Sequence, residues 1–435
     1  MSRPRAETPR MGTTHSAAPP GLVIVGAGPA GLMAAIAAAE AGARVALCEQ
    51  LPRPGTKLLA TGGGRCNLTN AAAPDAIAAG FGRAARFMRP ALDAMGPARI
   101  RQFFAGLGVP THSADGFHYF PLSETAEDVR RALWRRCERL GVDLRLRTRA
   151  TGLLIDGAAV AGVPAVRGVC TDRGDIPAPR VLIATGGRSY PRLGATGTGY
   201  QLAREAGHSI VEPVPALVPL ILRETWPRTC AGATLPAARI WIDLPRHART
   251  GRTGIVLVTH GGLSGPAVLD LSGDVSRLLA ERGDVPLRLD LRPDLSAADW
   301  LALFDQWQRT SGRKMLRNLL DAWLPASLAA ALCGLAGIAR DARPADVTRA
   351  RRLALADLLT RLPATVTGTE GFGKAIITRG GVSLREVDPR TLQSRLLAGL
   401  HFAGEILDLD GPCGGYNLTW AFASGRLAGQ AAAGA

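Results

Sequence analysis

The sequence predicts an α/β fold in which a β-rich segment and a helical segment separate two glycine-rich α/β parts. Three observations support this prediction. Residues 21–49 alternate a β-branched run, a glycine-rich turn, an Ala-rich helix and a second apolar run. Short apolar runs between Gly and Pro residues follow within residues 195–296, and Leu and Ala take helical spacing in residues 297–365. The glycine-rich style returns from residue 366 to residue 435.

Length and composition favour a globular protein of several domains. Of the 435 residues, 47% are hydrophobic and 20% are charged, which excludes disordered, collagenous and fibrous classes. We expect a disordered basic tail at 1–20, the first part of the main domain at 21–194, a β-rich insert at 195–296, a helical insert at 297–365 and the second part at 366–435. The 52 glycines exceed the usual share of about 7% and indicate tight turns and close approach of backbone to a ligand.

The first part begins with the pattern of a β–turn–α–β unit. Leu22–Val25 predicts a strand, Leu32–Glu40 predicts a helix, and Arg44–Cys48 predicts a second strand that leads into Glu49. The uncharged run 21–39 imitates a signal peptide or a membrane span, but its glycines and proline interrupt it. We therefore interpret this run as part of the folded domain.

Three glycines in the turn of this unit have separate tasks. Gly26 permits the tight turn, Gly28 lets backbone N–H groups reach a pyrophosphate at the positive end of the helix, and Gly31 allows close packing of helix and sheet. Glu49 can accept hydrogen bonds from both ribose hydroxyls of an adenosine, and an acid at this position disfavours a 2′-phosphate. FAD or NAD is therefore expected. The alternative is a glycine-rich turn that binds no ligand.

The remaining elements of the main domain follow from periodicity. Helical spacing recurs at 80–107 and at 124–140, with arginines on the opposite face, and strands are expected at 144–155 and 180–184. A final helix is expected at 416–430. The sequence has no internal repeat and no coiled-coil heptads.

A second glycine-rich segment, residues 57–70, contains three glycines followed directly by a cation, a thiol and an amide. Such a loop is suited to wrapping round a flavin. The cofactor contacts expected in this segment come from Lys57, Gly63, Gly64, Arg65 and Asn67.

From this segment onward the chain resembles a bacterial family of FAD-dependent oxidoreductases, the aminoacetone oxidase-like or bile-acid-reductase-like flavoproteins. These proteins carry a Gly-Gly-Gly-Arg-Cys-Asn-x-Thr-Asn segment, which stands here at residues 62–70. Further motifs of the resemblance lie at 184–191, 194–200, 259–266, 374–382 and 404–417. The resemblance covers roughly residues 21–430.

By that resemblance the fold is an α/β fold with an FAD-binding Rossmann-type domain that is interrupted by a β-rich insert and a helical insert. The cofactor is FAD, and the better-understood members look like reductases of activated carbon–carbon double bonds. One branch is similar to enzymes that reduce unsaturated steroid acids, and another is similar to a ribosomal RNA dihydrouridine synthase, which saturates a uracil ring. The motifs add Thr185, Gly186, Gly404 and Glu405 to the expected cofactor contacts, with Glu405 near the ribityl chain.

Gly414 and Gly415 open the final helix. We expect their N–H groups to point at the pyrimidine edge of the flavin, with Tyr416 and Asn417 also at the cofactor. Stabilised negative charge at that edge favours the anionic reduced flavin and hydride chemistry. The alternative is a Gly-Gly turn that packs against the first helix.

Reduction of a conjugated double bond needs a proton donor as well as a hydride. Cys66 follows Arg65, which could lower the pKa of the thiol, although many cysteines are only small core residues. Cys413 stands beside the Gly-Gly turn, and His260 belongs to a motif of the insert that could cover the flavin. For His260 the alternative is a structural histidine.

The formal net charge of +16 favours an anionic partner, with nucleic acid first among the candidates. Nearly all of this charge is arginine, which codon bias also explains. Two dense tracts could follow a phosphate backbone, or could be solvated helix faces: arginines 130, 131, 135, 136, 139, 145, 147 and 149, and arginines 340, 343, 349, 351 and 352.

These observations predict a cytoplasmic FAD-dependent oxidoreductase that receives electrons from transiently bound NAD(P)H. Three hypotheses for its substrate compete: a uracil in ribosomal RNA, a small unsaturated acid, ketone or amine, or no substrate at all in a flavin-bearing RNA-binding factor. Seven scattered cysteines without a Cys-x-x-Cys pair argue against a zinc site and against a disulfide framework. We expect no metal and no stable membrane association.

Overall fold

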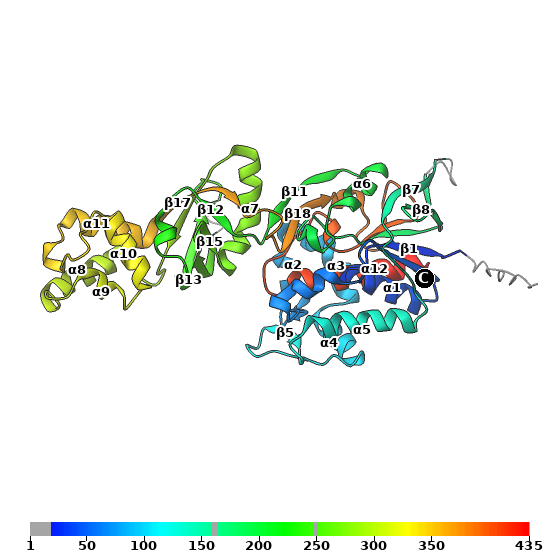
Figure 1. The fold of residues 1–435 in the computed structure, drawn as a ribbon, viewed down its shortest axis with the longest axis horizontal. Coiled ribbons are helices and arrows are strands. Elements are labelled where there is room, and N and C mark those ends of the chain that lie inside the picture. Colours follow the sequence, from blue (N-terminus) through cyan, green and yellow to red (C-terminus); the bar gives the residue numbers. More distant parts are fainter. Residues whose placement is uncertain (1–18, 158–163, 248–250, 435) are drawn as a thin grey trace, which may run out of the picture.

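The computed structural model describes residues 19–157, 164–247 and 251–434. Most of the expected tail 1–20 lies outside these residues. The described chain forms two lobes (Figure 1). We define the sheet lobe as residues 19–216 and 377–434 and the barrel lobe as residues 217–376, because two separate hydrophobic cores fill them.

A five-stranded parallel sheet forms the centre of the sheet lobe. Its strands follow the order β19-β10-β1-β2-β6. They are β1 Leu22–Val25, β2 Val45–Glu49, β6 Asp143–Leu146, β10 Val181–Ile183 and β19 Leu400–Phe402. All neighbours pair in parallel, and β19 from the C-terminal part pairs with β10. The two glycine-rich parts of the chain therefore build one sheet, as expected.

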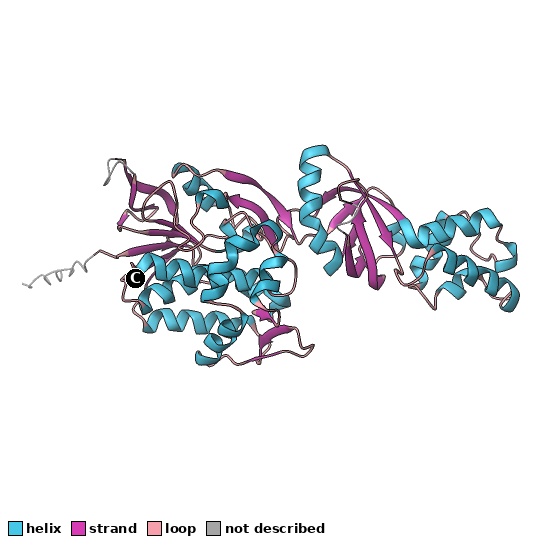
Figure 2. Cartoon of the chain, turned by 180° about the vertical axis from the view of Figure 1, so that it is seen from behind, coloured by secondary structure: helices cyan, strands magenta, loops and turns pink. Residues whose placement is uncertain are grey.

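The helices of this lobe pack around the parallel sheet and its smaller neighbours (Figure 2). They are α1 Pro29–Glu40, α2 Pro74–Gly80, α3 Ala85–Ala94, α4 Pro97–Gly106, α5 Ala126–Arg139, α6 Thr198–Glu205 and α12 Tyr416–Ala433. The first and last helices cross at very short range, because a Cβ added at Gly425 or Gly429 would overlap the carbonyl oxygen of Ala30 or Ala34. Small residues on both helices thus allow the N-terminal and C-terminal parts to pack as one body.

Smaller elements surround the parallel sheet. One antiparallel sheet contains β7 Ala150–Asp156, β8 Ala165–Thr171 and β9 Ile176–Pro177, and a second contains β3 Thr69–Asn70, β4 Thr111–His112 and β5 His118–Pro121. The strand expected at 144–155 is wrong as a single element, because Arg147 turns the chain with a φ of 52°. The residues before this turn join the parallel sheet, and those after it begin β7.

An antiparallel pair of strands leads into and out of the barrel lobe: β11 Ile210–Ala216 and β18 Ile377–Val382. The barrel closes in the order β12-β15-β14-β13-β16-β17. Its strands are β12 Leu220–Leu222, β13 Thr234–Ile242, β14 Arg252–Val258, β15 Gly262–Ser264, β16 Val285–Asp290 and β17 Leu362–Thr369. The helix α7 Pro266–Arg282 lies between β15 and β16 and packs on the barrel.

The helical segment is itself an insertion within the barrel, between β16 and β17 (Figure 1). It contains α8 Ala297–Thr310, α9 Leu316–Leu320, α10 Ala326–Leu335 and α11 Arg349–Arg361. Two expected boundaries differ from this arrangement. The strand β17 spans the expected boundary at 365 and closes the barrel, whereas α6, expected in the β-rich insert, buries Tyr200 and Ala203 in the core of the sheet lobe. No described helix has both the length and the apolar character needed to cross a bilayer.

Candidate functional site

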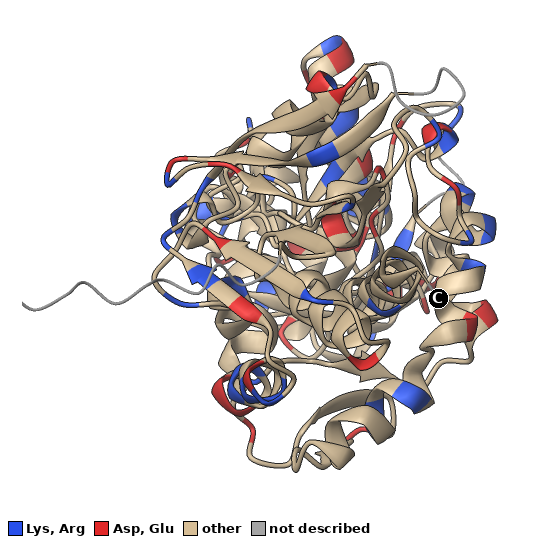
Figure 3. Ribbon diagram, turned by 90° about the vertical axis from the view of Figure 1, so that its right-hand side faces the viewer, with Lys and Arg blue, Asp and Glu red and all other residues tan. Residues whose placement is uncertain are grey.

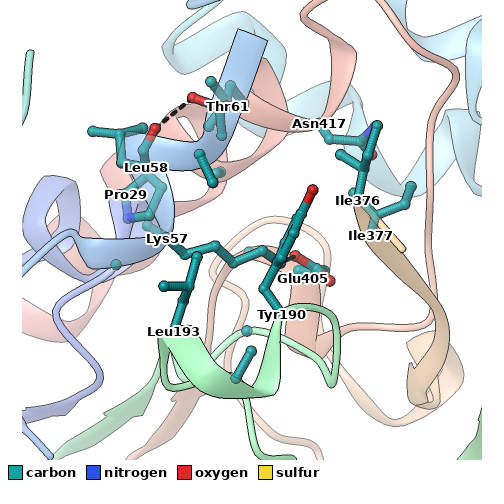
Figure 4. Close-up of a pocket in the computed structure, with 18 of the residues that line it drawn as sticks. Pro29, Lys57, Leu58, Thr61, Tyr190, Leu193, Ile376, Ile377, Glu405 and Asn417 are labelled. Carbon is teal, nitrogen blue, oxygen red and sulfur yellow. Dashed lines mark hydrogen bonds and ion pairs between the residues drawn. The ribbon is translucent and has the colours of Figure 1, made fainter. Parts of the chain in front are cut away.

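A cavity of about 520 Å³ opens along the carboxyl ends of β1, β2 and β10 and extends to the base of the barrel lobe. Its lining comes from residues 26–30, 376–377 and 403–405, from parts of 49–63, 184–195 and 409–421, and from Asn67 and Leu217. Figure 4 shows side chains from both parts of the sheet lobe pointing into this space, among them Lys57, Tyr190, Glu405 and Asn417. The carboxyl end of a parallel sheet is the edge at which α/β proteins bind their ligands.

The glycines of the first turn divide into two that the fold needs and one that it does not. Gly26 has a φ of 99°, and a Cβ there would lie 2.7 Å from the carbonyl oxygen of Ala184. A Cβ at Gly31 would overlap the carbonyl oxygen of Gly26. By contrast, a Cβ at Gly28 would meet no protein atom within 4 Å. Packing therefore explains Gly26 and Gly31, whereas Gly28 keeps open a space that belongs to the cavity.

The N-terminus of α1 faces this open space. Gly28 is the N-cap residue, Pro29 begins the helix, and neither a capping side chain nor an acidic residue occupies the first turn. The N–H groups of the first turn and the positive end of the helix dipole therefore remain available to an anion. Such a site is typical for a pyrophosphate.

Glu49, at the end of β2, places a carboxylate in the same cavity. Its Oε2 accepts a hydrogen bond of 3.0 Å from the N–H of Ala27, and its Oε1 accepts one of 2.9 Å from the N–H of Leu51. Burial raises the pKa of Glu49, and these two backbone donors oppose that rise. Each oxygen keeps a second lone pair, so the fixed carboxylate can accept the two hydroxyls of a ribose.

Lys57 and Glu405 form the charged centre of the cavity, although 348 residues separate them in the sequence. The Nζ of Lys57 donates to Glu405 Oε2 and to Ser189 Oγ, each at 2.7 Å. Glu405 Oε1 accepts from Ser189 Oγ at 2.9 Å and from the N–H of Thr378 at 2.8 Å. The sequence singled out Lys57 and Glu405 separately. It missed their pairing, Ser189 and Thr378, because no local pattern connects four distant segments.

The two glycine-rich motifs at opposite ends of the chain interlock beside this centre. Asn70 Nδ2 donates to the carbonyl of Gly414 at 2.8 Å, and the hydroxyls of Thr69 and Thr419 are 2.8 Å apart. A Cβ at Gly415 would come within 2.8 Å of the backbone of Thr69. Residues 69–70 and 414–419 are therefore one structural unit.

The Gly-Gly turn opens α12, as expected, with Gly415 as the N-cap residue. The expected direction of its N–H groups needs a correction. In the amide orientation that satisfies its neighbours, Asn67 accepts a hydrogen bond of 3.2 Å from the N–H of Gly415 and donates one of 2.9 Å to the carbonyl of Thr69. Asn67 lines the cavity, but it uses these bonds to hold the turn. The N–H of Gly415 therefore serves the protein rather than a ligand.

The two residues after this turn also have structural contacts. Asn417 lines the cavity and holds the preceding loop, accepting from the N–H of Gly411 and donating to its carbonyl, both at 2.9 Å. Tyr416 packs against Phe81, with ring centroids 6.4 Å apart, and is not among the described residues that line the cavity.

Some of the remaining residues expected to contact the cofactor line the cavity, and others do not. The lining includes Gly63, Thr185, Gly186 and Gly404. Gly64 and Arg65 do not belong to the described lining. The Arg65 guanidinium lies 4.4 Å from the centroid of the Phe120 ring and 3.4 Å from Glu124.

Of the three expected proton donors, Cys413 lines the cavity, whereas Cys66 and His260 are absent from the described lining. Cys66 is fully buried, and burial raises the pKa of its thiol to about 12. The expectation that Arg65 lowers this pKa is wrong, because the guanidinium turns away to Phe120. His260 lies on an exposed turn between β14 and β15 of the barrel lobe.

Cys413 has a partner that the sequence did not indicate. Its backbone N–H donates to Asp270 Oδ1 at 2.7 Å, across the boundary between the lobes. Burial raises the pKa of the Cys413 thiol, and the neighbouring charge of Asp270 raises it further. The thiol is therefore protonated at neutral pH. The motif at 259–266 ends at the first residue of α7, four residues before Asp270, so only the fold brings Asp270 to this position.

Many arginines of the two tracts form ion pairs. Arg130 pairs with Glu127 at 2.6 Å, and Arg136 pairs with Glu40 at 2.8 Å. Figure 3 shows basic and acidic residues interspersed over the sheet lobe. A second hollow beside α5 collects Arg131, Arg135 and Arg139, together with Asp128 and Glu138. Within the described ranges, no metal-binding group of three His, Cys, Asp or Glu side chains occurs.

Comparisons with known proteins extend over nearly the whole chain. The family model described as HI0933-like protein Rossmann domain matches residues 20–431. The 3-dehydro-bile acid delta(4,6)-reductase of Clostridium scindens is 35% identical over 94% of this chain and 98% of its own length. The ribosomal RNA dihydrouridine synthase of Haemophilus influenzae is 30% identical over 92% of this chain and 96% of its own length.

A solved structure also matches the overall arrangement. The 3-ketosteroid delta1-dehydrogenase of Sterolibacterium denitrificans superposes with a TM-score of 0.52, at 12% identity, over 95% of this chain and 99% of the other chain. At this identity the likeness concerns the fold alone.

Proposed function

The chain belongs to the HI0933-like family of Rossmann-fold, FAD-dependent oxidoreductases, and from this premise we propose that it is an NAD(P)H-driven reductase of a carbon–carbon double bond activated by a carbonyl group. One observation carries the proposal. Cys413 lines the same cavity as the nucleotide-binding turn, and its thiol keeps its proton at neutral pH. Reduction of such a bond requires a proton donor at that place.

The residues present fit FAD. Gly28 and the uncapped N-terminus of α1 would hold the pyrophosphate, and Glu49 would hold the adenosine ribose. When bound, FAD supplies two-electron hydride chemistry. The Lys57–Glu405 pair would fix the neighbouring backbone segments and present polar atoms to the middle of the cofactor.

The names of the two relatives share one chemistry. One is a reductase of a bile acid, and the other makes dihydrouridine, the product of saturating the double bond of uridine. In both substrates a carbonyl group stands next to the double bond. Such a bond accepts a hydride at one carbon and a proton at the other, so one cavity with one thiol donor serves either substrate.

Anaerobic mixing of the FAD-loaded protein with NADH or NADPH tests the electron donor. We expect at least one nicotinamide to bleach the flavin absorbance within minutes. Bleaching by dithionite but by neither nicotinamide would overturn this part of the proposal. The reduced protein is then mixed with a 3-dehydro-Δ4,6 bile acid or with ribosomal RNA that lacks dihydrouridine.

The return of the flavin absorbance with either acceptor measures reduction of the double bond. We expect Cys413→Ala to slow this return by about a hundredfold, which is within the usual contribution of a positioned proton donor. Cys66→Ala is the matched control, since Cys66 is not among the described residues that line the cavity. Equal rates in the two variants would remove Cys413 from the mechanism.

A second candidate function, reduction of a uracil in ribosomal RNA, is favoured by the hollow beside α5. There Arg131, Arg135 and Arg139 follow one face of the helix at intervals of one turn. Within the described chain, neither Arg135 nor Arg139 forms an ion pair. A phosphate backbone would fit such a row of cations.

Nucleoside mass spectrometry of ribosomal RNA from a deletion strain and its parent tests this candidate. Loss of one dihydrouridine per ribosome, restored by the wild-type gene and not by an Arg135→Ala/Arg139→Ala gene, would support an RNA substrate. An unchanged level would favour the small-molecule substrate. If Cys413→Ala also restored the modification, Cys413 would not be the proton donor for this substrate.

A further inference from the structure

We infer that Asp270, which belongs to the barrel lobe, is a positioning residue that holds Cys413 in place at the cavity and sets a carboxylate beside its thiol. The active site is therefore completed across the boundary between the lobes. This inference rests on the proposed function, because it assigns a role in the proton donation proposed above.

The geometry starts from one face of α7. Asp270 and Asp274 are one turn apart, and both face the sheet lobe. Asp270 Oδ1 accepts the hydrogen bond of 2.7 Å from the Cys413 N–H, while Asp274 pairs with Arg379 of β18. Arg379 in turn donates to Asp410 at 2.8 Å. Two carboxylates of α7 thus bind the sheet lobe, one at the loop that carries Cys413 and one at Arg379 within β18.

The surroundings of Asp270 affect its own pKa and that of the Cys413 thiol. Burial raises the pKa of Asp270, and the hydrogen bond from Cys413 and the charge of Arg252 of β14 oppose that rise. Burial raises the pKa of both the Cys413 thiol and the Tyr416 hydroxyl, and the charge of Asp270 raises both further. A carboxylate and a thiolate so close together disfavour each other, so the pair retains a proton on sulfur.

The two bonds of α7 have different consequences. The contact of Asp274 with Arg379 contributes only to the docking of the lobes, since neither side chain lines the cavity within the described residues. The contact of Asp270 contributes to docking and also reaches a residue of the lining. Removing one carboxylate or the other therefore separates the structural effect from the effect on the thiol.

The test is the rate at which iodoacetamide alkylates Cys413 in the FAD-loaded protein between pH 7 and pH 10, followed by peptide mass spectrometry. Asp270→Asn keeps the shape of the side chain and removes its charge. We expect this variant to raise the alkylation rate at pH 8 by about tenfold, because loss of a neighbouring anion lowers the thiol pKa and the thiolate is the reactive form.

Asp274→Asn is the matched control on the same helix face and should change the Cys413 rate by less than about twofold. Cys66, which is fully buried, reports unfolding in the same digest. The inference is overturned if Asp270→Asn leaves the pH profile unchanged, if Asp274→Asn accelerates alkylation equally, or if Cys66 becomes reactive to the same degree. Alkylation requires no substrate and no nicotinamide, so its outcome is independent of whether NAD(P)H bleaches the flavin.

Discussion

Gly28→Ala should weaken FAD binding while it leaves the stability of the fold nearly unchanged. The residue has a φ of −76°, which alanine adopts without strain, and the added Cβ would meet no protein atom within 4 Å. The fold therefore tolerates the methyl group. The same methyl group would occupy the space through which a pyrophosphate approaches the first turn of α1.

The expected magnitude follows from the hydrogen bonds at stake. A charged hydrogen bond to a backbone N–H contributes about 1.5–3 kcal/mol, so loss of one such bond weakens FAD binding about ten- to a hundredfold. The cost to the folded protein is smaller. Alanine is a poorer N-cap residue than glycine, and this lowers the free energy of unfolding by up to about 1 kcal/mol.

The assay is the release of FAD on serial dilution, followed by flavin fluorescence, together with thermal unfolding after FAD has been removed from both proteins. The FAD-free comparison is needed because a bound ligand raises the Tm by mass action. Gly31→Ala is the control, since its Cβ would overlap the carbonyl of Gly26 and should lower the FAD-free Tm strongly. If Gly28→Ala retained FAD as tightly as the wild type, or lost as much FAD-free stability as Gly31→Ala, the reasoning would be refuted.

Three further predictions concern stability. Glu405→Gln should weaken the contact with the half-buried Lys57 and reduce the free energy of unfolding by about 1–2 kcal/mol in urea, whereas an unchanged midpoint would contradict the assigned network. Burial lowers the pKa of His401 to about 4. Between pH 6.5 and pH 4, His401 therefore binds a proton in the unfolded chain but not in the folded chain. Stability should fall by about 3 kcal/mol between pH 6.5 and pH 4, and His401→Asn should lose that part of the dependence in pH-resolved unfolding curves. Gly429→Ala should destabilise the contact of α12 with α1 by about 2 kcal/mol or more, while Gly334→Ala in α10, which meets no atom within 4 Å, should be neutral or slightly stabilising in the same unfolding assay.

Local signals were enough for the elements that build the nucleotide-binding turn. The β-branched run, the glycines at 26, 28 and 31 and the Ala-rich helix occur within twenty residues, and their order and spacing alone indicate the turn. The helical segment was also expected, from a sequence rich in Leu and Ala. Boundaries were less predictable. The role of β17 depends on pairing with β12 and β16, which are distant in the sequence.

The candidate proton donors show more clearly what the sequence alone could not predict. From the sequence, Cys66 beside Arg65 was a better candidate for the donor than Cys413. Only the tertiary structure buries Cys66 completely and turns Arg65 toward Phe120. Adjacency along the chain says little about the direction of a side chain, so the electrostatic effect expected from a neighbour did not occur.

The sequence by itself determined the nucleotide-binding unit, the two glycine-rich parts of one domain and the presence of β-rich and helical segments between them. The tertiary structure alone decided which polar groups meet. The Lys57–Glu405 pair and the Asp270–Cys413 contact join residues that are 348 and 143 positions apart. The physical reason is that periodicity and turn chemistry act over a few residues, whereas a site depends on contacts between distant segments that form only when the whole chain packs.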